Sequence, residues 1–220
     1  MKKSFFIVNS VFTLALSVTA ALAAPNDDWG VNLKAGTLGV GVELSKSLSD
    51  KFSANLGFNS YNFNTTETTN GIDYDYKFDL QSAALLANYH PFTGVFRFTV
   101  GALYNNNELK LTGKPSAGST YTINGVSYTA AQVGTLTGKL TFDKIAPYLG
   151  IGWGSRPGSK LGLTADVGAL YQGAPKLSLT ASGAAAGLTS DLEQERKSAE
   201  SDLSDLKWYP VISLGIYFRF

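Results

Sequence analysis

The chain has 220 residues, enough for one domain, and a formal net charge of +1 without any long run of one sign, so a nucleic-acid partner has no support. Cysteine is absent, which excludes a lipid-anchored cysteine and a disulfide framework. Beyond Ala24 no stretch approaches the roughly 20 consecutive apolar residues of a membrane-spanning helix, so a membrane protein of this sequence has to be a closed barrel.

The N-terminus has the layout of a secretory signal peptide. Lys2 and Lys3 precede an apolar run from Phe5 to Ala24, and the small-residue pattern Ala21-Leu22-Ala23 lies near its end. We expect cleavage after Ala23, which makes residues 1–23 the signal peptide and residues 24–220 one mature domain. An uncleaved membrane anchor is the alternative.

From Trp29 onward, apolar residues alternate with polar or small ones, which is the period of an extended strand. The apolar phase runs from Trp29 to Ala35 and continues unchanged from Leu38 to Leu44, across Gly36-Thr37. This pattern fits either one long strand or two short strands.

The next strand begins at Phe52 and changes phase part-way. Its apolar residues have even numbers up to Phe58, whereas Tyr61 and Phe63 have odd numbers, which predicts a β-bulge near Asn59-Ser60. The threonine-rich residues that follow, 64–71, are expected to form a loop in water.

A returning strand is expected from residue 74 to about residue 88, followed by a turn at residues 90–94 and a strand at residues 96–104. A second polar loop is expected at about residues 111–138. Within it, Asn124-Gly125 predicts a small hairpin.

The next two strands differ in their phase. Leu140 and Phe142 enter a strand whose phase slips at Asp143-Lys144 before it continues to Trp153. Residues 161–179 keep one phase throughout. That length exceeds the roughly 9–11 residues that a spanning strand needs, so this strand is expected to project beyond the membrane.

The C-terminal segment predicts a short helix and a closing strand. Leucines and an alanine at helical spacing predict an amphipathic helix from Leu188 to Leu206. From Trp208 the alternation runs to the last residue, Phe220, which is typical of the closing strand of an outer-membrane barrel. Counting residues 29–35 as a separate strand gives eight, an even number as in bacterial barrels.

The predicted fold is therefore all-β: an eight-stranded antiparallel transmembrane β-barrel with a short helix in its last extracellular loop. Its location would be the outer membrane of a Gram-negative bacterium. A soluble barrel, the alternative, would carry its charges outside, whereas here the charged residues within strands lie opposite the apolar face. These candidate lumen charges are Lys34, Glu43, Arg97, Asp166 and Arg219.

Two interpretations of the lumen charges stay open. They form either a constriction that selects solutes or a plug in which opposite charges satisfy each other, because an unpaired buried charge is costly. The interior of an eight-stranded barrel is just wide enough for side chains to fill it, which favours the plug.

Aromatic residues gather near the predicted strand ends, as in the girdles at the two membrane interfaces. One rim would carry Tyr61, Phe63, Tyr74, Tyr76, Tyr104, Tyr171 and Trp208, and the other rim Phe52, Phe92, Trp153, Phe218 and Phe220.

The sequence holds little catalytic chemistry. The single histidine, His90, falls in a predicted periplasmic turn, and no Ser/His/acid set can be assembled without it. Metal-ligand spacing is absent, although Asp73, Asp75 and Asp79 are candidates for weak cation binding. We expect no catalytic residue, no cofactor and no metal.

Four segments from Ile123 onward carry a resemblance: INGVSY at 123–128, IAPYLGIG at 145–152, VGALY at 167–171 with GAPKL at 173–177, and WYPV at 208–211. In this order they resemble the carbapenem-susceptibility-associated outer-membrane protein family (CarO-like), over nearly half of the chain. The resemblance implies an eight-stranded outer-membrane barrel with uptake of small solutes such as basic amino acids. It identifies no substrate-contacting residue.

The expected function is an outer-membrane barrel that is structural or that facilitates the passage of small polar solutes. The alternatives are a surface interaction protein acting through the loops at residues 111–138 and 181–207, and a lipid-modifying barrel enzyme. The expected partners are outer-membrane lipid, lipopolysaccharide and, through the strand ending at Phe220, the barrel-assembly machinery; the chain is expected to be a monomer.

Overall fold

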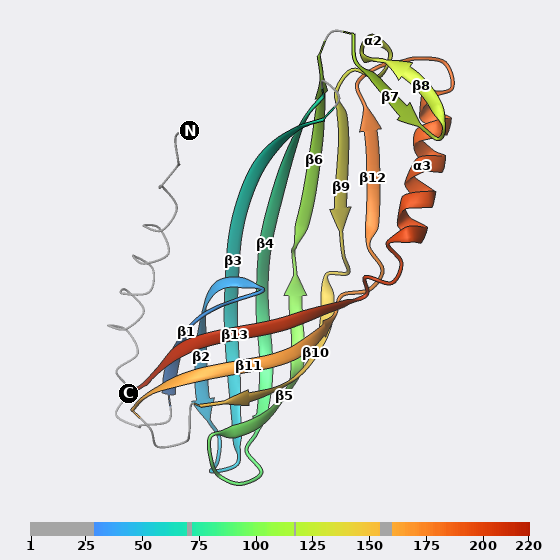
Figure 1. Cartoon of the computed structure of the whole chain (residues 1–220). Helices are drawn as coiled ribbons and strands as arrows, with labels where there is room; N and C mark the ends of the chain where they lie inside the picture. Colours follow the sequence, from blue (N-terminus) through green and yellow to red (C-terminus); the bar gives the residue numbers. More distant parts are fainter. Residues whose placement is uncertain (1–28, 70–71, 117, 155–159) are drawn as a thin grey trace, which may run out of the picture.

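A computed structural model describes residues 29–69, 72–116, 118–154 and 160–220, so the predicted signal peptide, residues 1–23, lies outside the described residues. The chain forms a closed barrel of eight strands, and a sheet continues away from one end of it (Figure 1). Neither helix in the described part of the chain is long and apolar enough to cross a bilayer.

The barrel strands follow one another around the barrel in antiparallel pairs. Their bounds are β1 (Trp29–Gly36), β2 (Gly39–Ser47), β3 (Phe52–Thr69), β4 (Ile72–Tyr89), β5 (Phe96–Asn105), β10 (Ile145–Trp153), β11 (Leu161–Tyr171) and β13 (Trp208–Arg219). The first strand, β1, pairs with both β2 and β13, so the barrel is closed without an edge. The eight-stranded prediction is confirmed, with the first two strands separate and joined by a turn at Thr37-Leu38.

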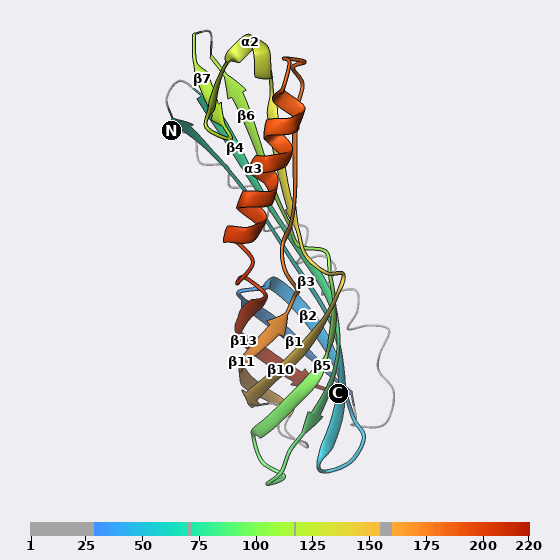
Figure 2. The ribbon, with the colours of Figure 1, turned by 90° about the vertical axis from the view of Figure 1, so that its right-hand side faces the viewer.

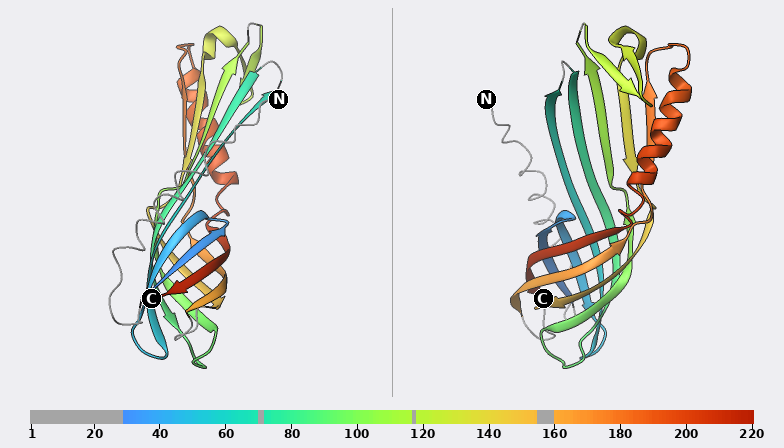
Figure 3. Two further views of the ribbon diagram at one scale, coloured as in Figure 1. Left: turned by 90° about the vertical axis from the view of Figure 1, so that its left-hand side faces the viewer. Right: turned by 45° about the vertical axis from the view of Figure 1, so that its right-hand side comes forward.

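Beyond the barrel, the chain builds a second folded unit that we call the outer module. It consists of the outer parts of β3 and β4 together with β6 (Glu108–Pro115), β7 (Thr120–Ile123), β8 (Val126–Thr129), α2 (Ala130–Val133), β9 (Leu136–Thr141), β12 (Lys176–Ala181) and α3 (Leu188–Asp202). One half of β4 pairs with the barrel strand β5, and the other half pairs with β6 of the module. Figures 2 and 3 show α3 lying along one side of the module sheet.

The outer module has its own apolar core, and the predictions of loops at residues 64–71 and 111–138 are wrong: apart from residues 70–71 and 117, which lie outside the described residues, these ranges belong mostly to β3, β6, β7, β8, α2 and β9. The core residues are Ile72, Tyr121, Ile123, Tyr128, Val133, Leu188 and Leu192. The hairpin prediction is confirmed: β7 and β8 pair around Asn124-Gly125, whose φ angles of 51° and 75° are those of a tight hairpin turn. The helix begins at Leu188 as predicted but ends at Asp202 rather than Leu206.

The predicted bulge near Asn59-Ser60 is wrong. β3 and β4 pair in one uninterrupted register from Phe52↔Tyr89 to Thr69↔Ile72. The phase changes because the apolar side chains move to the other face of a regular strand: Phe58 points outward from the barrel, whereas Phe63 lies on the face that continues the barrel interior. Below this point the outward face meets lipid, and above it only the other face is covered by protein.

The slip at Asp143-Lys144 has the same origin. The pair β5–β10 in the barrel and the pair β6–β9 in the module share one register, so no residue is inserted between them. Leu140 belongs to the module face that α3 covers, and Ile145 belongs to the lipid face.

A register shift does occur in residues 161–179, where the apolar residues keep one phase along the sequence. This segment forms two strands, β11 and β12, instead of the single strand predicted. Between β11 and β12, residues 172–175 leave the ladder, and the pairing with β9 and β10 is offset by one residue across them. This offset turns Leu177 and Leu179 toward α3, although Tyr171 at the same sequence phase points outward. Gly173 permits the shift with φ 72° and lies so close to the Asp143 carboxylate that a side chain would overlap it.

Part of the predicted aromatic girdle is also corrected. Tyr104, Tyr171 and Trp208 are exposed on the outward face, and the rings of Tyr171 and Trp208 are 4.9 Å apart. On the other rim, Phe52, Phe92, Trp153 and Phe218 are exposed as well. In contrast, Tyr61, Phe63, Tyr74 and Tyr76 lie on the module side of the membrane boundary and on the face opposite the lipid-facing one.

We predict that Gly173→Ala destabilises the folded protein by about 1–3 kcal/mol, because a Cβ at this backbone angle is strained and overlaps Asp143. Urea unfolding of the protein refolded in detergent measures the effect. The matched control is Gly94→Ala, which places its Cβ 3.8 Å from the nearest atom and at no unusual φ. Equal stability of the two variants would contradict the assignment of the shift to Gly173.

Candidate functional site

The barrel interior is filled by side chains that alternate with the lipid-facing ones. Glycines make room for the larger residues among them: a Cβ at Gly152 would overlap Asp166 and Arg97, and one at Gly150 or Gly168 would overlap the Tyr148 hydroxyl. The small residues in these strands therefore let large polar side chains cross the lumen.

Four of the five candidate charges meet in what we call the lumen cluster: Lys34, Glu43, Arg97 and Asp166. Lys34 Nζ lies 2.8 Å from Asp166 Oδ2 and 3.3 Å from Glu43 Oε2, and Arg97 pairs with Asp166 Oδ1. These residues come from β1, β2, β5 and β11, so the ion pairs link strands across the barrel. Arg97 is only 2% exposed, which makes this one of the most deeply buried charges in the described chain.

Neutral polar groups complete the lumen cluster. Asn55 Nδ2 donates to Glu43 Oε1 over 2.9 Å, Ser213 Oγ donates to Asp166 Oδ2 over 3.3 Å, and Arg97 also donates to the Gly154 carbonyl over 3.0 Å. Because the buried carboxylates have both cationic and neutral donors, the cost of removing them from water is offset. Sequence reasoning missed Asn55 and Ser213, although both share the inward phase of their strands.

The fifth candidate, Arg219, lies on the same inward face but at the inner end of the barrel. It is opposite Gly30 in the β1–β13 register and 8% exposed. The structure therefore does not bring Arg219 into the lumen cluster.

An apolar layer closes the lumen on the side of the outer module. It consists of Ala84, Leu86, Leu103, Ala146, Tyr148, Leu170 and Val211. Between this layer and the lumen cluster lies a cavity of about 40 Å³, and a second space of about 10 Å³ lies beside Arg97 and Asn88. These volumes admit one or a few water molecules but no solute as large as an amino acid.

Polar contacts hold α3 against the outer module. The Asn124 amide donates to Glu195 Oε2 over 2.8 Å, and the Tyr128 hydroxyl donates to Asp191 Oδ2 over 2.5 Å. At the other end of the helix, Glu200 Oε1 accepts the Leu177 amide of the edge strand β12 over 2.8 Å. Hydrogen bonds to these carboxylates lower the pKa values of Asp191 and Glu200.

The remaining candidates have structural surroundings. His90 is 1% exposed at the turn after β4, and its Nδ1 lies 3.2 Å from the Gly94 carbonyl. Asp73 accepts from Thr68, Asp75 pairs with Lys114, and Asp79 pairs with Lys77, so these three carboxylates do not converge on one point.

Two solved structures from Acinetobacter baumannii are similar to this chain. CarO2 is 27% identical with a TM-score of 0.59, and the match covers 87% of this chain and 98% of that chain. CarO is 25% identical with a TM-score of 0.57, and the match covers 87% of this chain and 97% of that chain.

The protein is a CarO-like outer-membrane β-barrel. The resemblance noted in the segments from Ile123 onward is thereby confirmed and extends over most of the chain. No protein-family model and no curated protein matches it. Within this CarO-like barrel, the lumen cluster and the outer module are the two regions whose geometry bears on function.

We predict that Asp166→Asn destabilises the CarO-like barrel by about 3–5 kcal/mol, because it leaves the buried Arg97 without its carboxylate and removes one partner of Lys34. The matched control is Asp143→Asn. It breaks an ion pair of the same 2.8 Å length to Lys176, but one that is 67% and 47% exposed, so less than about 1 kcal/mol is expected. Urea unfolding in detergent compares them; equal effects would contradict a role of the lumen cluster in stability.

We predict that α3 loosens from β12 in acid. The pKa of Glu200 is lowered first by the Leu177 amide and further by Arg196, so its stabilising contribution is present above its ordinary pKa and is lost as the pH falls through the lowered pKa. Hydrogen exchange at the Leu177 amide should speed up in acid beyond the intrinsic pH effect. In Glu200→Gln, whose amide oxygen still accepts but does not titrate, this additional change should vanish; its persistence would contradict the assignment.

Proposed function

We propose that the barrel is a closed membrane anchor that holds the outer module outside the cell. The observation that carries this proposal is the filled lumen: the charges are paired, an apolar layer lies above them, and the spaces among them measure about 40 Å³ and 10 Å³. Both spaces, which lie among described lumen residues, are too small for a solute.

The outer module is larger and more fully folded than a membrane anchor needs. The Ile72–Asp79 half of β4, which pairs with β6 of the module, is roughly 25 Å long, and a helix and a hairpin pack on one face of its sheet. A chain that only needed to close a barrel would connect these strands by short loops. Binding at the cell surface is therefore the activity that we assign to this protein, in line with the surface-interaction alternative.

Passage of small polar solutes is the second candidate function. It is favoured by one observation: three buried charges of the lumen cluster, Lys34, Glu43 and Asp166, line the 40 Å³ cavity, where apolar residues would seal the barrel at lower cost. Passage would require Lys34 and Arg97 to separate from Asp166. Catalysis has less support, since His90 is buried at the inner turn. Lipid, lipopolysaccharide and assembly-machinery partners stay predictions.

We predict that vesicles carrying the refolded wild-type protein pass neutral, basic and acidic amino acids no faster than empty vesicles, because the lumen cluster and the apolar layer block the barrel. Flux is measured for the wild type, Arg97→Ala, Asp166→Ala and the exposed control Asp143→Ala. Refolding of each variant is verified by its heat-dependent mobility in gels.

Wild-type flux that depends on solute charge and changes with Arg97→Ala or Asp166→Ala, but not with Asp143→Ala, would overturn the closed anchor and establish passage. Flux that appears only in the two lumen variants would show that the cluster is the seal and would support the anchor.

A further inference from the structure

The outer module contains a cleft of about 540 Å³ between its sheet and α3, far larger than either space in the barrel. Most of its lining is aliphatic: Leu109, Leu111, Leu136, Leu140, Leu177, Leu179, Leu192 and Leu203, with Ile72, Ile123 and Ala199. The volume lies within the roughly 300–1,000 Å³ of small-molecule sites in proteins.

The sequence explains why helix and sheet leave this space open. Along the face of α3 that packs on the sheet, Leu192 is followed by Glu195 and Ala199 before Leu203 restores a large apolar side chain. A packed core would hold large side chains at these positions, because protein interiors are normally filled.

Water is a poor occupant of such a space. The leucines of the sheet, from Leu109 on β6 to Leu179 on β12, are half-buried and offer no hydrogen-bond partner, and buried water needs two to four polar partners. An apolar ligand would fill the cleft at a gain of about 0.8 kcal/mol for each buried methylene group.

The charge at the edge of the cleft indicates the charge of the head group that a ligand would carry. Glu195 is the one ionisable carboxylate in the described lining; it is exposed, and Asp191 lies one turn before it on α3. No lysine or arginine is among the lining residues that the structure describes. Threonines 120 and 122 on β7 add hydroxyl groups beside the leucines.

We propose that the cleft binds a small amphipathic molecule with an unbranched alkyl chain and a cationic head group, the chain lying between α3 and the leucines and the head facing Glu195. This assignment rests on the proposed function, since it names the ligand class of the outer module. The ligand assignment does not depend on whether the barrel is closed.

The absence of native cysteine permits a direct test. Ala199→Cys places a single thiol in the cleft, and Ser198→Cys places one on the adjacent, exposed position of the same helix. Maleimide modification of each variant is timed in nanodiscs with hexyl-, heptyl- or octylammonium below their micellar concentrations. We expect protection of Cys at 199 but not at 198, with an apparent Kd that tightens about fourfold for each added methylene.

The head group is tested with octyl sulfonate. Octylammonium should bind more tightly than octyl sulfonate, and Glu195→Gln in the Ala199→Cys background should remove this preference while keeping the dependence on chain length. The glutamine retains an acceptor for the Asn124 amide, so the hairpin contact is conserved.

Two outcomes would overturn the proposal: no protection at position 199 at any chain length, or equal slowing at positions 198 and 199, which would indicate a general effect on the lipid. Solute flux does not report on the cleft. A conducting barrel would thus disprove the closed anchor and leave this result intact, while unprotected Cys at 199 in a non-conducting barrel would disprove only the ligand assignment.

Discussion

One constraint organises the whole chain: apolar side chains must face outward where the strands meet lipid and must face the protein where the same strands stand in water. In hydrocarbon the outer surface of a barrel is its apolar surface. Beyond the membrane, β3, β4, β6, β9 and β12 can bury apolar side chains only under α3 and the β7–β8 hairpin. Each long strand therefore has to exchange its apolar face at the membrane boundary.

The chain meets this constraint in two ways. In β3, and between β9 and β10, the register is continuous and the sequence changes phase, as between Phe58 and Phe63. Between β11 and β12 the sequence keeps its phase and the backbone changes register at Gly173 instead. A phase slip in the sequence and a bulge in the backbone are thus alternative solutions to one problem, and each occurs where the other is absent.

This explains how much of the fold could be predicted from the sequence. The barrel, its strand number and the turn at Asn124-Gly125 follow from alternation and local turn chemistry, and the structure agrees with them. The bulge at Asn59-Ser60 was wrong because alternation reports which side of a strand is apolar and not which solvent lies there. The outer module could not be predicted for the same reason, since residues such as Thr65 and Thr112 resemble loop residues until their ladder partners are known.

The lumen cluster, too, could be predicted from the sequence only in part. Inward alternation was sufficient to place Lys34, Glu43, Arg97 and Asp166 on one face, but their meeting depends on which strands are neighbours. β10 lies between β5 and β11, and Gly152 on it leaves the opening through which Arg97 reaches Asp166. Arg219 shares the inward face and is separated from the cluster only by its position along β13, which a face assignment does not specify.

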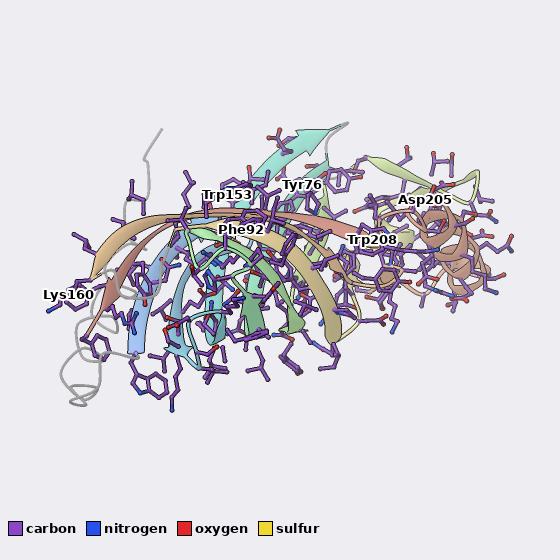
Figure 4. The ribbon with its side chains drawn as sticks, turned by 90° about the horizontal axis from the view of Figure 1, so that it is seen from below. Tyr76, Phe92, Trp153, Lys160, Asp205 and Trp208 are labelled. Carbon is purple, nitrogen blue, oxygen red and sulfur yellow. The ribbon has the colours of Figure 1, made fainter. Side chains whose placement is uncertain are left out.

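The link between barrel and outer module fixes where the cleft lies relative to the membrane. α3 ends at Asp202, and residues 203–207 lead directly into β13 at Trp208, whose ring packs on Tyr171; Figure 4 shows Trp208 between Asp205 at the module and the barrel strands that extend to Lys160. Gln172, in the register shift, is hydrogen-bonded to the segment that leads into β13. Its backbone amide donates to the Lys207 carbonyl over 2.9 Å, and its side chain donates to the Leu206 carbonyl over 3.1 Å. Leu203, which lines the cleft, thus begins the segment that Gln172 holds at its other end. The backbone shift that turns Leu177 and Leu179 toward α3 therefore also places them in the lining of the cleft.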